Sequence, residues 1–115
     1  MGLDQQASTA IAPEVLALLP LPAHERMSQQ QRRGTACVWD GIILAPDTVV
    51  DLGPRPLRPG GDYVWYPRAC RRCVGDRALR ALHDHAPYCE LCVENAADCE
   101  VGRVLVRLVR EGSRA

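Results

Sequence analysis

Two Cys-x-x-Cys pairs constrain the fold of this chain more strongly than any other feature of its sequence. Cys70 and Cys73 form the first pair, Cys89 and Cys92 form the second, and fifteen residues separate the pairs. A Cys-x-x-Cys turn places two thiolates at adjacent corners of one tetrahedron, and a zinc ion then needs two further ligands. Two such pairs at this spacing therefore predict zinc binding.

The composition explains why a metal would be needed. The 115 residues include no Phe, two Trp and three Tyr, and small domains with so thin a core usually require disulfides, metals or oligomerisation. Residues 1–10 lack the basic and apolar regions of a signal peptide, and the apolar stretch 15–19 is too short to span a bilayer. We therefore expect a cytoplasmic protein without membrane association. In the cytoplasm cysteines bind metal more often than they form disulfides.

The first third of the chain differs from the rest because it contains no cysteine. Pro13 at a first-turn position predicts a two-turn helix over 13–19, and Ser28 followed by Gln31 predicts a capping box. Isolated helices this short are unstable, so a flexible segment is favoured over a docking segment that presents residues 15–19. The predicted organisation is a flexible segment over 1–34, a zinc module over 35–86, a second zinc knuckle with a C-terminal helix over 87–112, and a tail over 113–115.

Beyond residue 35 the pattern predicts an α+β fold. Two β-favouring runs, 48–52 and 63–66, are expected to pair as a hairpin with a long loop. A helix is predicted from residue 74 to about 83, and Pro87 ends it. Asn95 is expected to cap a last helix that ends at Gly112. In that helix an apolar stripe comprises Val101, Val104, Leu105 and Leu108, and the opposite face carries Arg103, Arg107 and Arg110.

Two zinc ions use the cysteines better than one. In a single-zinc ribbon both pairs would share one ion, which leaves Cys37 and Cys99 idle. The fifteen residues between the pairs have a helical pattern, which a ribbon hairpin would not. A knuckle at Cys37, a hairpin, and a helix that opens with Cys-x-x-Cys follow the order of a treble clef finger. We therefore predict a treble-clef-like finger followed by a second site.

Each predicted site has one uncertain ligand. The first site comprises Cys37, Asp40, Cys70 and Cys73, and the alternative for Asp40 is a solvated turn residue that leaves three thiolates. The second site comprises His85, Cys89, Cys92 and Cys99. His83 is the rival histidine, placed further back on the helix.

Several segments resemble small actinobacterial zinc-finger-like proteins of unknown function. The matching segments are TACVW at 35–39, ACRRC at 69–73, ALHDHAP at 81–87, CELC at 89–92 and CE at 99–100. The resemblance covers about two thirds of the chain and implies zinc binding without a settled activity. The first knuckle of that family is Cys-x-x-Cys, whereas this chain has Asp40 in place of the second cysteine.

A more local resemblance covers His85, Cys89 and Cys92. Their His-x3-Cys-x2-Cys spacing is similar to that of zinc-containing anti-sigma factors, in which zinc and thiols respond to oxidation.

The sequence favours a non-catalytic module that binds a protein partner. HNH nucleases also use a treble clef, but their hairpin carries a catalytic histidine, and neither run of the predicted hairpin contains one. The alternative is a transcription-related regulator, either DNA-binding or a redox-responsive zinc switch. A formal net charge of zero lacks the basic excess of a typical nucleic-acid binder, so a nucleic-acid partner is not favoured.

Overall fold

The computed structural model describes residues 11–57 and 60–113, which fall into two compact units. Within the described residues, unit 1 comprises residue 11 and residues 21–70, and unit 2 comprises residues 12–20 and 71–113. One boundary between the units lies between Cys70 and Arg71. The fold is a mixture of helices and small antiparallel sheets, as expected for the α+β class.

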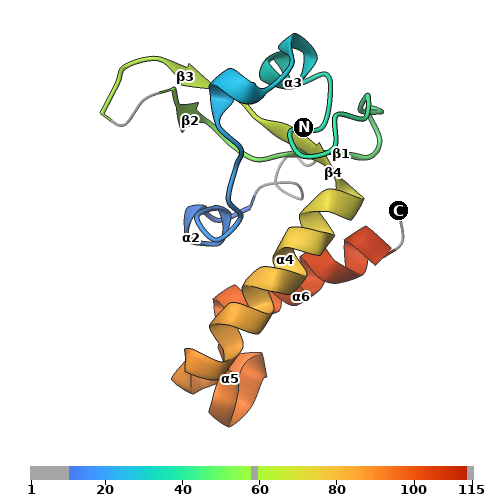
Figure 1. Cartoon of the computed structure of the whole chain (residues 1–115). Coiled ribbons are helices and arrows are strands. Elements are labelled where there is room, and N and C mark those ends of the chain that lie inside the picture. The colour runs from blue at the N-terminus through green and yellow to red at the C-terminus, as the bar shows by residue number, and fades with distance from the viewer. Residues whose placement is uncertain (1–10, 58–59, 114–115) are drawn as a thin grey trace, which may run out of the picture. The chain divides into compact units, whose positions relative to one another are not determined.

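Unit 2 is built on two long helices that lie side by side (Figure 1). These are α4 (Arg71–His85) and α6 (Glu100–Ser113). Between them the chain forms a helical corner of η2 (Ala86–Tyr88), α5 (Glu90–Asn95) and η3 (Ala96–Asp98). The short helix α2 (Pro13–Leu16) also contacts α6. Buried side chains of this unit include Val15, Leu19, Val74, Ala78, Leu105 and Leu108.

The backbones of α4 and α6 touch at two glycines. A Cβ atom added to Gly75 would lie 2.9 Å from the Cα of Gly112, and one added to Gly112 would lie 2.8 Å from the carbonyl oxygen of Arg71. Real Cβ atoms essentially never come this close to backbone. A glycine inside a helix costs about 1 kcal/mol relative to alanine, so the close helix contact explains why Gly75 is there.

Unit 1 contains two small antiparallel sheets. Strand β1 (Val49–Asp51) pairs with β4 (Arg68–Cys70), and β2 (Arg55–Pro56) pairs with β3 (Val64–Trp65). The predicted pairing of 48–52 with 63–66 is therefore wrong, because each run pairs with a segment that was assigned to no strand. Val49 lies opposite Cys70, whereas Arg55 lies opposite Trp65. The segment that joins β1 to β2 is therefore one residue longer than the segment that joins β3 to β4. Gly53, with φ of 81°, takes up the extra residue in a conformation that glycine adopts readily.

The first third of the described chain forms short helices. The predicted helix begins at Pro13, although α2 ends at Leu16 and a turn follows. A 3₁₀ helix, η1 (His24–Arg26), precedes α3 (Gln29–Arg33). The capping box is confirmed: Ser28 Oγ accepts the Gln31 N–H, and Gln31 Oε1 accepts the Ser28 N–H. Val15, Leu19 and Met27 are buried, so this segment contributes to the interior.

Two helix boundaries differ from those predicted. Helix α4 begins at Arg71 rather than residue 74, so Cys73 lies in its first turn. Asn95 is the last residue of α5 and does not cap α6, which begins at Glu100. Asn95 instead uses its side chain locally, because Oδ1 accepts the Ala97 N–H and Nδ2 donates to Asp98. Among the described residues, no helix is long and apolar enough to cross a membrane.

Candidate metal centre

Two groups of side chains bring potential metal ligands together. One comprises His85, Cys89, Cys92 and Cys99, and the other comprises Cys37, Asp40, Cys70 and Cys73. In each group the four ligand atoms all lie within 4.8 Å of one another. These are the eight residues that the sequence singled out as metal ligands. We call them the imidazole group and the carboxylate group, after the one ligand in each that is not a thiol.

The imidazole group is assembled entirely within unit 2. His85 is the last residue of α4, Cys89 precedes α5, Cys92 lies on α5, and Cys99 precedes α6. The Nε2 atom of His85 lies 3.4 Å from Cys99 Sγ, and Cys89 Sγ lies 3.7 Å from the same sulfur. Cys99 is thus the centre of the group, and it is buried.

Cys99 also caps the last helix. Its Sγ accepts a hydrogen bond from the Gly102 N–H at 3.3 Å, and its carbonyl accepts the Arg103 N–H at 3.0 Å. The cap could not be recognised from sequence because cysteine is not among the usual capping residues.

Gly102 allows the sulfurs to reach the first turn of α6. A Cβ atom at this buried position would lie 3.1 Å from Cys92 Sγ and 3.6 Å from Cys99 Sγ. This role was missed by the sequence analysis, although an isolated glycine inside a helical pattern often has a packing reason.

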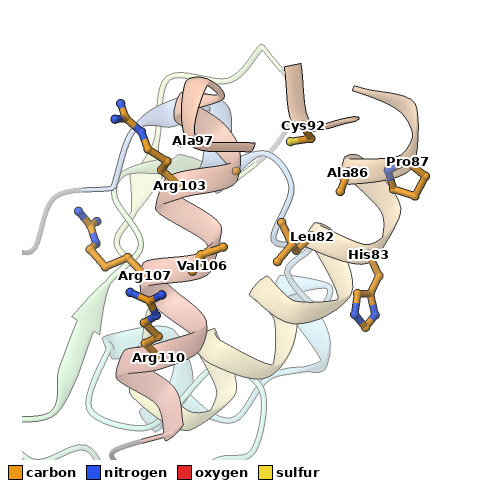
Figure 2. Close-up of a pocket in the computed structure, with 11 residues that line it drawn as sticks. Leu82, His83, Ala86, Pro87, Cys92, Ala97, Arg103, Val106, Arg107 and Arg110 are labelled. Carbon is orange, nitrogen blue, oxygen red and sulfur yellow. The ribbon is translucent and has the colours of Figure 1, made fainter. Parts of the chain in front are cut away.

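The two histidines of α4 lie in different surroundings. His85 is half-buried and contacts Cys99, whereas His83 is exposed. Figure 2 shows the His83 ring away from the labelled Cys92. The structure therefore brings His85, and not His83, to the thiols.

The three thiols of the imidazole group influence one another. Removal from solvent raises the pKa of Cys92 to about 12, and the neighbouring thiols of Cys99 and Cys89 act in the same direction. The pKa of Cys89 is lowered, chiefly because the Cys92 backbone N–H faces its sulfur. An N–H group that faces a sulfur favours the charged form of the thiol. The neighbouring thiols of Cys99 and Cys92 also lower the pKa of Cys89, which is opposite to the effect that the neighbouring thiols have on Cys92.

The carboxylate group begins at a knuckle in unit 1. The Cys37 N–H donates to the Ile42 carbonyl, the Gly41 N–H donates to the Cys37 carbonyl, and Gly41 has a φ of 76°. Burial raises the pKa of the Cys37 thiol, while the backbone N–H groups of Asp40, Cys70 and Trp39 act in the opposite direction. Cys37 is therefore enclosed by backbone donors, as expected for a zinc knuckle.

Asp40 uses its two carboxylate oxygens differently. Oδ1 accepts the Ile42 N–H at 3.0 Å, and Cys70 Sγ donates to Oδ2 at 3.7 Å. The sequence left open whether Asp40 is a turn residue or a ligand, and the geometry is compatible with both roles at once. Cys70 ends β4, and Cys73 follows one helical turn later, in α4.

Gln31 braces the knuckle from outside. Besides closing the capping box through Oε1, it donates through Nε2 to the carbonyls of Cys37 at 2.9 Å and Val38 at 3.2 Å. The sequence indicates only the capping role of Gln31, because nothing in the spacing predicts a contact with residues six and seven positions later.

Comparisons with known proteins assign no family to the chain. No protein-family model matches it, and no solved structure matches it. Among curated proteins, the chain is similar to nephrin from Homo sapiens, with 34% identity over 104 residues. The aligned region is 89% of this chain but 8% of nephrin, so the chain spans less than a tenth of the length of that protein.

Proposed function

We propose that this protein is a non-catalytic, zinc-stabilised module that binds a protein partner. The observation that carries the proposal is the convergence of His85 and three cysteines within 4.8 Å in unit 2. They come from successive turns of the chain, so one ion would tie together α4, α5 and α6.

The donor set and its spacing fit zinc. Three thiolates with one imidazole is a common ligand set of structural zinc sites. Two sulfurs bound tetrahedrally at about 2.3 Å from zinc are about 3.8 Å apart, and a sulfur and a nitrogen are about 3.5 Å apart. The Cys89–Cys99 distance of 3.7 Å and the His85–Cys99 distance of 3.4 Å agree with these values.

The carboxylate group is proposed as a second zinc site, within a treble-clef-like finger. The support is the order of elements: the knuckle at Cys37, the β ribbon, and α4, which begins directly after Cys70. Oxygen is an acceptable zinc ligand, and Asp40 Oδ2 faces Cys70.

The proposed module has no catalytic role because all four positions on each zinc would be filled by protein ligands. Catalytic zinc sites keep one position open for water or substrate. A binding role is supported by apolar side chains beside the knuckle, where Ile42 is 56% exposed and Ile43 is 67% exposed. In this proposal the protein works in the cytoplasm, where its thiols stay reduced.

A redox-responsive zinc switch that acts on another regulator is the second candidate. It is supported by the partial exposure of Cys89 and Cys92, because accessible zinc thiolates are open to oxidation. Rapid loss of the bound zinc in peroxide, reversed by a reductant, would favour this candidate over a purely structural role.

Native mass spectrometry tests the zinc stoichiometry. We expect two zinc ions per chain, with all six cysteines protected from alkylation until a chelator is added. One zinc per chain, with Cys37 and Cys99 both freely alkylated, would contradict the two-site proposal and favour a single-zinc ribbon.

A further inference from the structure

An apolar cleft of about 740 Å³ lies between α4 and α6 in unit 2 (Figure 2). Leu82 on α4 and Val106 on α6 point towards each other across it, and Ala86 and Pro87 extend the wall formed by α4. Its volume lies within the range of natural binding pockets, and its walls are mostly apolar.

The cleft is bounded at each end of the helix pair. At one end Gly75 and Gly112 hold the backbones of α4 and α6 together. At the other end Cys92, a member of the imidazole group, lines the cleft. The wall on α6 extends from Gly102 to Arg110, which corresponds to about 12 Å of helix. A partner helix of about three turns would cover this length.

One edge of the cleft carries a row of arginines. Arg103, Arg107 and Arg110 line it and are exposed, and their positions on α6 follow the spacing of one helical face. Figure 2 shows their guanidinium groups on the side of α6 that faces away from Leu82. The charges therefore flank the apolar cleft instead of filling it.

These arginines remain accessible to a partner. Arg103 forms an ion pair with Glu100, and Arg107 lies 3.8 Å from Glu111. Both are exposed pairs within one helix, which contribute little, so a carboxylate from outside can compete with them. No ion pair involves Arg110 among the residues that the structure describes.

We propose that this cleft binds an amphipathic helix of a protein partner whose acidic residues run beside its apolar stripe. The apolar stripe would enter between Leu82 and Val106, and the acidic residues would lie over Arg107 and Arg110. The inference rests on the proposed function and specifies the surface and the chemistry of the partner. Helices commonly bind in grooves through apolar residues spaced three and four apart.

The arrangement of charge favours a helix over two other occupants. A small anionic ligand would need positive partners among the apolar walls, whereas Arg103, Arg107 and Arg110 lie along one edge of the cleft. A second copy could offer the acidic and apolar helix α5, but α5 has six residues and is too short to cover the wall on α6.

Peptide display on the zinc-loaded full chain tests the proposal. The probe is a random library of helical peptides of about 15 residues. We expect the selected peptides to carry apolar residues at helical spacing with Asp or Glu alongside. Val106→Arg should weaken their binding at least about tenfold. Leu79→Arg is the matched control, since Leu79 is also partly exposed on a helix but does not line the cleft, and it should leave binding unchanged.

Charge exchange tests the arginine edge without altering the apolar walls. Arg110→Glu should lower the affinity for acidic peptides about threefold to tenfold. A peptide that carries Arg in place of the acidic residue facing position 110 should recover the affinity. Arg80→Glu, an exposed position on α4 outside the cleft, should have no effect. Zinc content and circular dichroism equal to those of the parent establish that each variant is folded, and Arg110→Glu serves if Val106→Arg does not fold.

The outcomes separate this inference from the proposed function. If peptides bind the Val106→Arg variant with the same affinity as the parent protein, the binding surface lies elsewhere. That result would overturn the inference but not the proposed function. The inference would also be overturned if the selected peptides lacked acidic residues. Two further results would overturn it: binding of a small amphiphile in the cleft with no peptide binding there, and self-association of the chain that Val106→Arg abolishes. Failure to select any peptide would count against the proposed function itself.

Discussion

The two ligand groups differ in how much of the chain each needs. The imidazole group gathers residues from fifteen consecutive positions, 85–99, whereas the carboxylate group spans 37–73. The first can form as soon as a helix ends and a corner turns, but the second requires a complete β ribbon to return Cys70 to Cys37. Closing a longer loop costs more conformational entropy. The comparison teaches that the same number of ligands can stabilise a local corner or tie together distant parts of a fold.

Removal of zinc should have the largest effect. Zinc binding can supply roughly 10 kcal/mol of folding free energy in small domains, and this chain has few large apolar side chains. We expect a chelator to abolish the cooperative thermal transition of residues 37–111, monitored by circular dichroism. A retained transition after complete zinc removal would mean that packing alone stabilises both groups.

Zinc binding at the imidazole group should depend on His85 more than on His83. His85→Ala removes a proposed ligand, and we expect zinc affinity to fall at least about 100-fold, since even indirect contacts to a ligand are worth 10–100-fold. His83→Ala is the matched control on the same helix. The readout is the rate of zinc release under a thiol reagent, and faster release from His83→Ala than from His85→Ala would reverse the assignment.

The stability of the carboxylate group should depend on Gln31, a residue outside the group. Gln31→Glu keeps the oxygen that closes the capping box but loses the donor to the Cys37 and Val38 carbonyls. The Val38 carbonyl would lose this donor and the Cys37 carbonyl would keep the Gly41 N–H, with a new carboxylate beside both. We expect a cost of about 1–3 kcal/mol. Urea unfolding of the zinc-loaded protein measures the loss, and Gln30→Glu, on the same helix, is the control. Equal stability of the two variants would show that the Gln31 side chain does not stabilise the knuckle.

Asp40→Cys should produce the smallest change and should reduce the difference between the groups. It replaces the carboxylate by a fourth thiolate, and we expect zinc affinity at this group to rise about tenfold, or ~1.4 kcal/mol. The gain is limited because Asp40 Oδ1 also accepts the Ile42 N–H. Competition with a metal indicator measures the affinity, with Asp47→Cys as an exposed control, and an unchanged affinity would identify Asp40 as a turn residue.

Local patterns predicted those parts of the structure that depend on neighbouring residues. Ser28 and Gln31 form the capping box because both partners lie within one turn. The Cys-x-x-Cys spacing likewise predicted that Cys70 lies near Cys73 and Cys89 near Cys92, since each pair lies within one local turn.

The sequence failed where a distant partner decides the conformation. The residues paired with Val49–Asp51 are set by the path of the whole ribbon, which β propensity does not encode. The start of α6 is capped by the Cys99 sulfur, so Asn95 does not begin this helix although Asn is the better intrinsic cap. The cleft was also not predicted, because it depends on how Leu82 and Val106 face each other across two helices.

The contact between Gly75 and Gly112 has a mechanical consequence. At this contact the two backbones meet without side chains between them, so a change in the angle between the helices would centre on it. His85 and Cys99 lie at the opposite ends of the same helices, roughly 15–20 Å away along their axes. A rotation of about 10° at the glycines would therefore move those ends by roughly 3 Å, about the length of one hydrogen bond. A metal ion bound by both His85 and Cys99 would therefore hold the angle between the two helices, and would set the width of the cleft from its far end.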